Sequence, residues 1–311
     1  MAEAGGVTGL EEFEEAASRR ERGLWSDAFR RLVRNRLAMG ALIVLILLGI
    51  LAVTGNTIGW VQRYDPAFDY DRSALKEGPS LDHFFGTDNL GRDNWSRVLQ
   101  GLLISLQVGL GVQGIVVVIG LLVGGTAALT GRLGDNILMR ITDLAYAFPD
   151  LLFIILIRAV LFGRDWPIIG NERLLVIFAI SFVSWTTVAR LVRGQMLSLA
   201  ERDYVIAARA MGATQRRIVF QHMLPNTLGP VIVAITFGIP IAIFAEAVLA
   251  FIGFGLSPPT ASLGTLVESG YRFIIETEWM LIPPAVVIAL LMLCFTFVGD
   301  GLRDALDPRA H

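Results

Sequence analysis

The side chains of this sequence that could act in catalysis or bind a metal are few and widely separated. Three histidines stand at positions 83, 222 and 311, and the one cysteine, Cys294, lies inside an apolar run. Nucleophilic catalysis and metal binding both require such groups to be clustered. The sequence therefore predicts no catalytic residue, no metal site and no disulfide framework.

The sequence also lacks the motif that most ATP-hydrolysing proteins use to hold phosphates. A P-loop ends in Gly-Lys-Ser or Gly-Lys-Thr. The one lysine of the chain, Lys76, follows Leu75. We therefore expect no cofactor in this chain, and any ATP-driven step must use ATP and Mg²⁺ on separate partner subunits.

Two ionisable residues stand inside long apolar runs. Arg158 and Glu246 both lie towards the distal ends of their runs. Charged groups inside a membrane are costly and often functional. We expect an interhelical ion pair between them, which either fixes helix packing or lines a translocation path or outer gate.

A charged stretch, AERDYVIAARAMGATQRRIVFQHMLPN, separates two apolar runs. Its helical spacing places Tyr204, Ala207, Ala208 and Met211 on one narrow apolar face. Gly212 can end this helix in the left-handed conformation. A second short helix should follow and stop at Leu224-Pro225. We call residues 200–225 the 200–225 loop.

The elements that must position these residues are membrane helices. The 311 residues are 54% hydrophobic and 17% charged, which is typical of a membrane protein, and the net charge of -2 argues against a nucleic-acid partner. Charge-poor runs long enough to span a bilayer predict six helices. They cover residues 37–58, 98–131, 136–162, 174–189, 228–254 and 279–299.

Local features refine these helices. Gly120 and Gly124 have the small-residue spacing that lets membrane helices pack closely. Pro149 should kink the third helix, and Gly238 with Pro240 should break the fifth. Trp25, Phe29, Leu32 and Val33 predict an interfacial amphipathic helix before the first span.

Arginine placement predicts the orientation. The segments 1–36, 131–140, 190–217 and 301–311 carry 17 of the 26 basic residues, and the segments on the opposite side carry 8. Basic residues are enriched on the cytoplasmic side. Both termini and the 200–225 loop should therefore be cytoplasmic.

The 200–225 loop resembles the EAA loop of bacterial ABC importer permeases. Ala207-Ala208, three residues, Gly212, nine residues and then an ending in Leu224-Pro225 match its spacing, whereas Ile206 and His222 replace a Glu and an Ile. The resemblance implies that this loop docks on an ATP-hydrolysing subunit. The implied coupling residues are Ala207, Ala208, Arg209, Gly212, Leu224 and Pro225.

A second string, FGTDNLGRD at residues 85–93, closely resembles the signature of the dipeptide/oligopeptide branch of these permeases. The matching residues are Phe85, Gly86, Thr87, Asp88, Leu90, Gly91, Arg92 and Asp93. We expect a structural role, in which the glycines turn the chain and the Asp and Thr side chains cap the next helix or pair with Arg92 and Arg97. Strings at 251–264 and 299–308 resemble the same branch, so the resemblance covers residues 25 to 309.

The resemblance implies an all-α integral membrane protein with six transmembrane helices and a MetI-like ABC importer permease fold. The expected parts are a cytoplasmic segment with its interfacial helix (1–36), a first transmembrane helix (37–58), an extracytoplasmic loop (59–97), a permease core of five helices (98–300) and a cytoplasmic tail (301–311).

The implied function is ATP-driven, binding-protein-dependent import of di- and oligopeptides across the cytoplasmic membrane by alternating access. The implied partners are a homologous second permease, two cytosolic ATP-binding subunits and an extracytoplasmic substrate-binding protein. Nickel, modified peptides and oligosaccharides are alternative cargoes within the same family. A secondary transporter is a remote alternative, because it would need its own ion-coupling site and the sequence contains no internal repeat.

Overall fold

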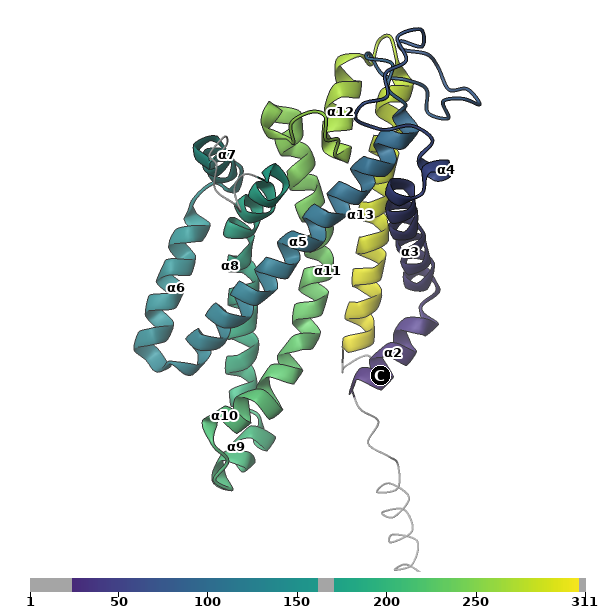
Figure 1. The fold of residues 1–311 in the computed structure, drawn as a ribbon. Helices are drawn as coiled ribbons and strands as arrows, with labels where there is room; N and C mark the ends of the chain where they lie inside the picture. Colours follow the sequence, from purple (N-terminus) through teal and green to yellow (C-terminus); the bar gives the residue numbers. More distant parts are fainter. Residues whose placement is uncertain (1–23, 162–170, 308–311) are drawn as a thin grey trace, which may run out of the picture.

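The computed structural model describes residues 24–161 and 171–307, and every regular element within these ranges is a helix (Figure 1). The first 23 residues of the predicted N-terminal segment, the end of the third predicted span at Phe162 and the last residues of the predicted tail lie outside these ranges.

Five helices are long and apolar enough to cross a membrane, and a bent pair of helices makes a sixth span if it is counted as one. The predicted six spans agree with this arrangement. The five helices are α3 (Arg36–Thr57), α5 (Asn94–Leu129), α8 (Glu172–Ala200), the continuous helix Gln215–Phe254, and α13 (Glu278–Leu306).

The bent pair confirms the predicted kink at Pro149. Helix α6 (Gly131–Ala147) and helix α7 (Asp150–Leu161) meet at 85°. Phe148, the residue before the proline, adopts extended backbone angles of φ -79 and ψ 137. A following proline disfavours the helical region for the residue before it, which accounts for the end of α6 at Ala147.

The helix from Gln215 to Phe254 corrects two predictions. It contains α10 (Gln215–Arg217), η1 (Ile218–Met223), α11 (Leu224–Leu249) and η2 (Ala250–Phe254), and it is interrupted neither at Leu224-Pro225 nor at Gly238 and Pro240. At the first site a π-helical turn precedes the proline, and the Leu224 amide bonds to the Val219 carbonyl. The wider turn accommodates a residue that lacks a backbone donor. At the second site, Gly238 gives space to the Gln113 side chain of α5.

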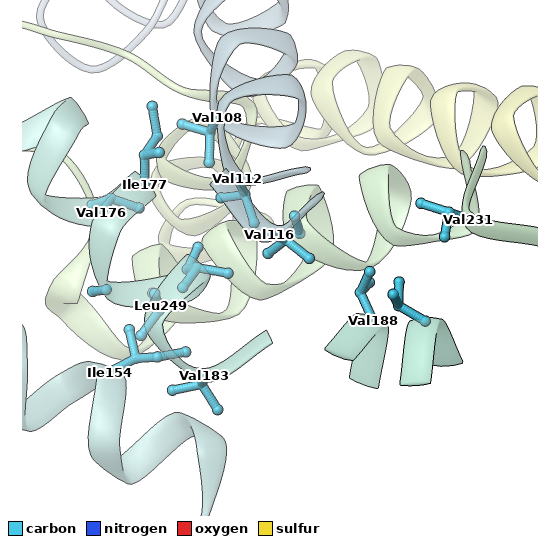
Figure 2. Close-up of a cluster of buried hydrophobic side chains, with 14 of the residues drawn as sticks. Val108, Val112, Val116, Ile154, Val176, Ile177, Val183, Val188, Val231 and Leu249 are labelled. Atoms are coloured by element: carbon cyan, nitrogen blue, oxygen red, sulfur yellow. The ribbon is translucent and has the colours of Figure 1, made fainter. Parts of the chain in front are cut away.

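Helix α5 packs closely along α8, as the glycine spacing predicts. A Cβ atom added at Gly124 would lie 2.2 Å from the Ala189 carbonyl oxygen, and one at Gly120 would lie 2.6 Å from Val188. The two backbones therefore approach closely only because these residues lack side chains. The largest core cluster extends from this contact towards α7 and α11, where Val112, Val116, Val183 and Leu249 come together (Figure 2).

The remaining helices lie at the two ends of the bundle. Helices α9 (Asp203–Ala210) and α10 lie at the same end as α2 (Leu24–Arg34) and the end of α13 (Figure 1). Helices α4 (Gly59–Gln62) and α12 (Leu263–Arg272) lie at the opposite end, with the irregular segment that precedes α5 (Figure 1). We refer to these as the α9 end and the α12 end.

Helix α2 presents an apolar surface outward, as the predicted amphipathic pattern requires. Phe29 and Val33 are exposed, whereas Ala28 is buried. Arg31 donates a hydrogen bond to the Asp307 backbone carbonyl at 3.2 Å, which ties α2 to the end of α13.

Candidate functional site

The 200–225 loop is a short helix, a glycine turn and a return into the membrane helix. The turn at Gly212 has φ +82, and its amide bonds to the Arg209 carbonyl at 3.0 Å. The Ala213 amide bonds to the Ala208 carbonyl, also at 3.0 Å. Together these bonds form a Schellman motif, in which glycine takes the left-handed position. The predicted helix end at Gly212 is confirmed.

The apolar face predicted for α9 is divided between two sides of the helix. Ala208 is buried, whereas Tyr204, Ala207 and Met211 are exposed, Met211 to 83%. The residue missed by the prediction is Val205, which is fully buried in the core cluster together with Ile218. Residues at i and i+3 share a face, so Val205 and Ala208 anchor the helix while positions 204, 207 and 211 form a separate outer stripe.

The outer surface of the 200–225 loop is apolar with a basic margin. Ile206 on α9 and Phe220 on η1 are exposed to 51% and 61%. Arg209 is also exposed. His222, which replaces the isoleucine of the motif, lies with its ring 6.2 Å from that of Tyr204. Contiguous exposed apolar side chains of this kind mark a surface that contacts another protein or a membrane.

The 85–93 string confirms the predicted pairing and capping. The Asp88 carboxylate forms buried ion pairs with Arg92, at 2.8 Å, and with Arg97. It also accepts the amides of Leu90 and Arg92 at 2.8 and 2.9 Å. Asp93 caps α5 by accepting the Ser96 amide at 2.8 Å. Charge-assisted bonds of this kind stabilise the turn that precedes α5.

Both glycines of the string stand where a side chain would collide with backbone. Gly86 has φ +65, and a Cβ there would lie 2.4 Å from the Glu77 carbonyl oxygen. Gly91 has φ +79, and a Cβ there would lie 2.0 Å from the carbonyl oxygen of Asp71. The Asp71 side chain is exposed, and hydrogen bonds from the Ser73 hydroxyl and amide lower the pKa of its carboxyl below the usual value.

Arg158 and Glu246 do not form the predicted ion pair. The Arg158 guanidinium pairs with the Glu172 carboxylate at 3.6 Å and also donates to the Gly255 carbonyl. Glu246 accepts hydroxyl hydrogen bonds from Ser262 at 2.6 Å and from Ser105 at 3.3 Å. The sequence predicted that Arg158 and Glu246 lie at similar depth and pair with each other. In the structure, Arg158 binds Glu172 and Gly255 instead, and Glu246 binds Ser262 and Ser105.

These contacts converge on the backbone of residues 255–263, which we call the 255–263 segment. Glu172 of α8 accepts the Ser257 amide at 2.7 Å. Gln100 and Ser105 of α5 accept the amides of Ala261 and Leu263, at 3.0 and 3.2 Å. With Arg158 of α7 and Glu246 of α11, four helices hold one segment at the α12 end of the bundle.

A cavity of about 570 Å³ lies between α5, the α6–α7 bend, α8 and α11. Its wall is mainly aliphatic and aromatic, and neither Arg158 nor Glu246 lines it. The polar residues in its wall are Gln113, Tyr146, Asp150, Ser184, Thr186 and Thr187. The sequence contained a signal for the last three, which is hydroxyl groups on one part of an otherwise apolar helix, but the prediction did not use it.

The chain matches known families over most of its length. The profile of the family described as "Binding-protein-dependent transport system inner membrane component" matches residues 116–311. The profile described as "N-terminal TM domain of oligopeptide transport permease C" matches residues 23–79.

Curated relatives and solved structures agree with these matches. The chain is 38% identical over 295 residues to the oligopeptide transport system permease protein OppC of Bacillus subtilis, covering 95% of this chain and 93% of that protein. It is 41% identical to the dipeptide transport system permease protein DppC of the same organism, covering 91% and 85%. The same comparison with OppC of Escherichia coli gives 38% identity and 96% coverage of both chains.

The fold is shared with a chain of the MetNI methionine ABC transporter in inward-facing conformations. Two such structures have TM-scores of 0.54 and 0.56 at 22% and 21% identity, and each alignment covers 68% of this chain and 96% of that chain. The six helical passes, the EAA-like loop, the 85–93 signature and these matches have one explanation: the chain is a multi-pass membrane protein of the binding-protein-dependent ABC importer permeases, in the branch that contains OppC and DppC.

Proposed function

We propose that this chain imports di- and oligopeptides across the cytoplasmic membrane as one permease subunit of an ATP-driven transporter. The peptide cargo is supported by the names of relatives that match nearly the full chain, which are oligopeptide and dipeptide transport permeases. The observation that carries the ATP-driven mechanism is the 200–225 loop, which projects from the bundle at the α9 end with exposed apolar side chains (Figure 1).

The loop transmits force from a separate ATPase. Ala207 and Arg209 face outward, where they contact the ATPase, and the buried Ala208 keeps α9 on the bundle. Gly212 sets the angle between α9 and the following helix. Leu224 and Pro225 begin α11, so that a displacement of the loop passes directly into a spanning helix. Coupling requires the docking free energy to differ between the two states of the transporter.

We infer that the α9 end lies in the cytoplasm. The N-terminal helix α2, the 200–225 loop and the end of α13 lie together at this end (Figure 1). These elements lie mainly in the segments 1–36, 190–217 and 301–311, which with 131–140 carry 17 of the 26 basic residues, a bias that favours a cytoplasmic location. The 59–97 loop and α12 are then extracytoplasmic, where a substrate-binding protein delivers peptide.

The absence of a P-loop from this sequence and the resemblance to ABC importer permeases are the basis for the proposed partners. The chain carries no P-loop, so two ATP-binding subunits supply ATP and Mg²⁺. The family pairs homologous permeases, and a second permease completes a translocation path that begins in the cavity beside α8.

We place Arg158 and Glu246 at an outer gate rather than in the path itself. Both bind the 255–263 segment, and neither lines the cavity. Since this segment ties α5, α7, α8 and α11 together at the α12 end, its contacts must loosen if those helices are to separate.

Other cargoes of the family remain alternatives to peptides, namely nickel, modified peptides and oligosaccharides. Among the residues that the structure describes, no group of three His, Cys, Asp or Glu side chains could hold a metal ion. This finding does not decide between nickel and peptide, because a nickel cargo requires no metal cluster in this chain. A secondary transporter would draw on an ion gradient instead of ATP.

The test is uptake by proteoliposomes that contain this chain with its permease, ATPase and binding-protein partners. Labelled di- to pentapeptides, nickel and an oligosaccharide are offered with ATP inside, and again with an ion gradient and no ATP. We expect peptide uptake with ATP alone. Uptake that follows the ion gradient without ATP would contradict the mechanism, and ATP-driven uptake of another cargo alone would contradict the substrate.

A further inference from the structure

Arg190 lies on the face of α8 that lines the cavity. Val183, Thr186 and Thr187 contribute to the cavity wall, and Arg190 follows them at i+7, i+4 and i+3. Residues at these spacings share one helix face. Arg190 is ten residues from the end of α8 at Ala200, which is about 15 Å at 1.5 Å per residue. The guanidinium group therefore lies between the cavity and the α9 end of the bundle.

The contacts of Arg190 differ from those of the other two arginines on α8. Arg193 forms a two-point ion pair with Asp135 of α6, and Arg173 donates to the Gln107 side chain at 2.5 Å. Arg190 instead stacks on the ring of Tyr146, 4.1 Å from the ring centroid. Its Nη2 atom is buried and has no hydrogen-bond partner within residues 24–161 and 171–307.

A half-buried guanidinium that has an aromatic ring beside it and a buried donor without a partner is suited to an anion. Leaving a charged donor unsatisfied is costly, so a binding partner from outside the chain would be favourable at this position. Tyr146 itself lines the cavity, so the guanidinium lies directly behind the cavity wall. An anion that enters the cavity could reach Nη2 after a small shift of the Tyr146 ring.

The cavity also carries a group of the opposite charge. Asp150 lines it from the start of α7, across from α8. The remaining wall is mainly aliphatic and aromatic, and its other polar residues, Gln113, Ser184, Thr186 and Thr187, are uncharged. A cargo that has one cationic and one anionic end matches this distribution of charge.

We propose that Arg190 binds the terminal carboxylate of peptide cargo while the peptide occupies the cavity, with Asp150 facing its amino end. This inference rests on the proposed function and specifies how the cavity recognises its cargo. A guanidinium donates two parallel hydrogen bonds to a carboxylate, a geometry that neither an amide nor an uncharged terminus reproduces. The chain then selects for free peptide termini and tolerates varied side chains.

The test compares uptake of one tripeptide in two forms, with a free C-terminal carboxylate and with a C-terminal amide, by the full transporter in proteoliposomes. The measured quantity is the ratio of the two initial rates. The same binding protein is used throughout, so its own preference cancels when the ratio of a variant is divided by that of the unmodified transporter. We expect Arg190→Gln to lower this ratio about tenfold, as the loss of a charge-assisted contact implies.

Two variants separate recognition from structure. Arg190→Lys keeps a positive charge and should retain part of the preference for the free acid. Arg193→Gln removes a structural ion pair one turn further along α8; its total rate can fall, but its acid-to-amide ratio should stay that of the unmodified chain. An unchanged ratio in Arg190→Gln, or an equal fall in Arg193→Gln, would overturn the proposal.

The outcome also distinguishes this inference from the proposed function. If the unmodified transporter moves neither form of the peptide, the peptide cargo is wrong. If Arg190→Gln moves both forms with the same ratio as the unmodified chain, the peptide cargo stands and the role of Arg190 does not.

Discussion

The carboxylate of Glu246 on α11 accepts a hydrogen bond from the hydroxyl of Ser262, the N-cap residue of α12, at 2.6 Å. Ser262 in turn accepts the Thr265 amide, and Ser105, which also donates to Glu246, accepts the Leu263 amide. One buried acid thus fixes the start of α12 through two hydroxyl groups.

Replacing Glu246 with alanine should loosen α12. Ser262 and Ser105 would each lose a buried acceptor, at a cost of about 1–3 kcal/mol for each unsatisfied group. We expect faster amide hydrogen exchange across residues 263–272 and a lower unfolding temperature in detergent. Glu268→Ala on the same helix breaks only the pair with Arg272, whose side chain is 70% exposed, so it should change neither measurement appreciably. Equal effects of the two substitutions would contradict this role of Glu246.

Removing the Asp88 carboxylate should prevent the 85–93 string from folding. Asp88→Ala would leave the side chains of Arg92 and Arg97, which are 9% and 8% exposed, without their carboxylate. The loss of one partner from a buried ion pair costs about 3–5 kcal/mol. We expect a large fall in the amount of protein recovered after membrane extraction. Asp82→Asn, at an exposed position in the same segment, provides the comparison, and normal recovery of Asp88→Ala would show that the network is dispensable.

A β-branched residue at Gly212 should uncouple ATP hydrolysis from transport. An added Cβ would meet nothing within 4 Å, so the cost of Gly212→Val comes from the left-handed backbone alone, roughly 1–2 kcal/mol. Relief of this strain would turn α9 away from its docking angle while the spans remain inserted. We expect continued ATP hydrolysis with a several-fold lower ratio of peptide moved to ATP consumed.

The same position allows a rescue. Asparagine tolerates the left-handed region better than other side chains, so Gly212→Asn should retain most of the coupling. Gly194→Ala, on the exposed surface of α8 and also without neighbours within 4 Å, should have no effect. If valine at 212 transports as well as asparagine does, the backbone conformation is not what the coupling requires.

The sequence predicted the features that depend on local spacing. Pro149 ends the helix before it, Gly212 forms a left-handed turn, and Gly120 with Gly124 let α5 approach α8, as their local spacing predicted. The local rule for proline was wrong at Leu224-Pro225 and at Gly238 with Pro240, where the helix continues. Asp88 lies four and nine residues from its two arginine partners, and such short loops leave little choice of pairing.

The sequence did not predict the features that depend on how distant segments meet. Arg158 was matched to Glu246 by depth alone, because nothing local to either residue indicated that the 255–263 segment would lie between them. The prediction also assigned residues from two sides of α9 to a single apolar face, because it lacked the same kind of long-range information. The alanines of α9 fit either a packed or an exposed face, and only the position of the core cluster determines that Val205 and Ala208 turn inward.

The outer surface of α9 should contact an ATPase in the cytoplasm. Met211 is 83% exposed, and Cys294 is the native cysteine to be removed first. In a Cys294→Ser background, Met211→Cys should crosslink to a cysteine placed on the partner ATPase, with a yield that changes when ATP is added. A membrane-impermeant thiol reagent applied from outside the cell should leave Met211→Cys unmodified. Modification from outside, or the absence of any crosslink to the ATPase in an actively transporting complex, would contradict the account.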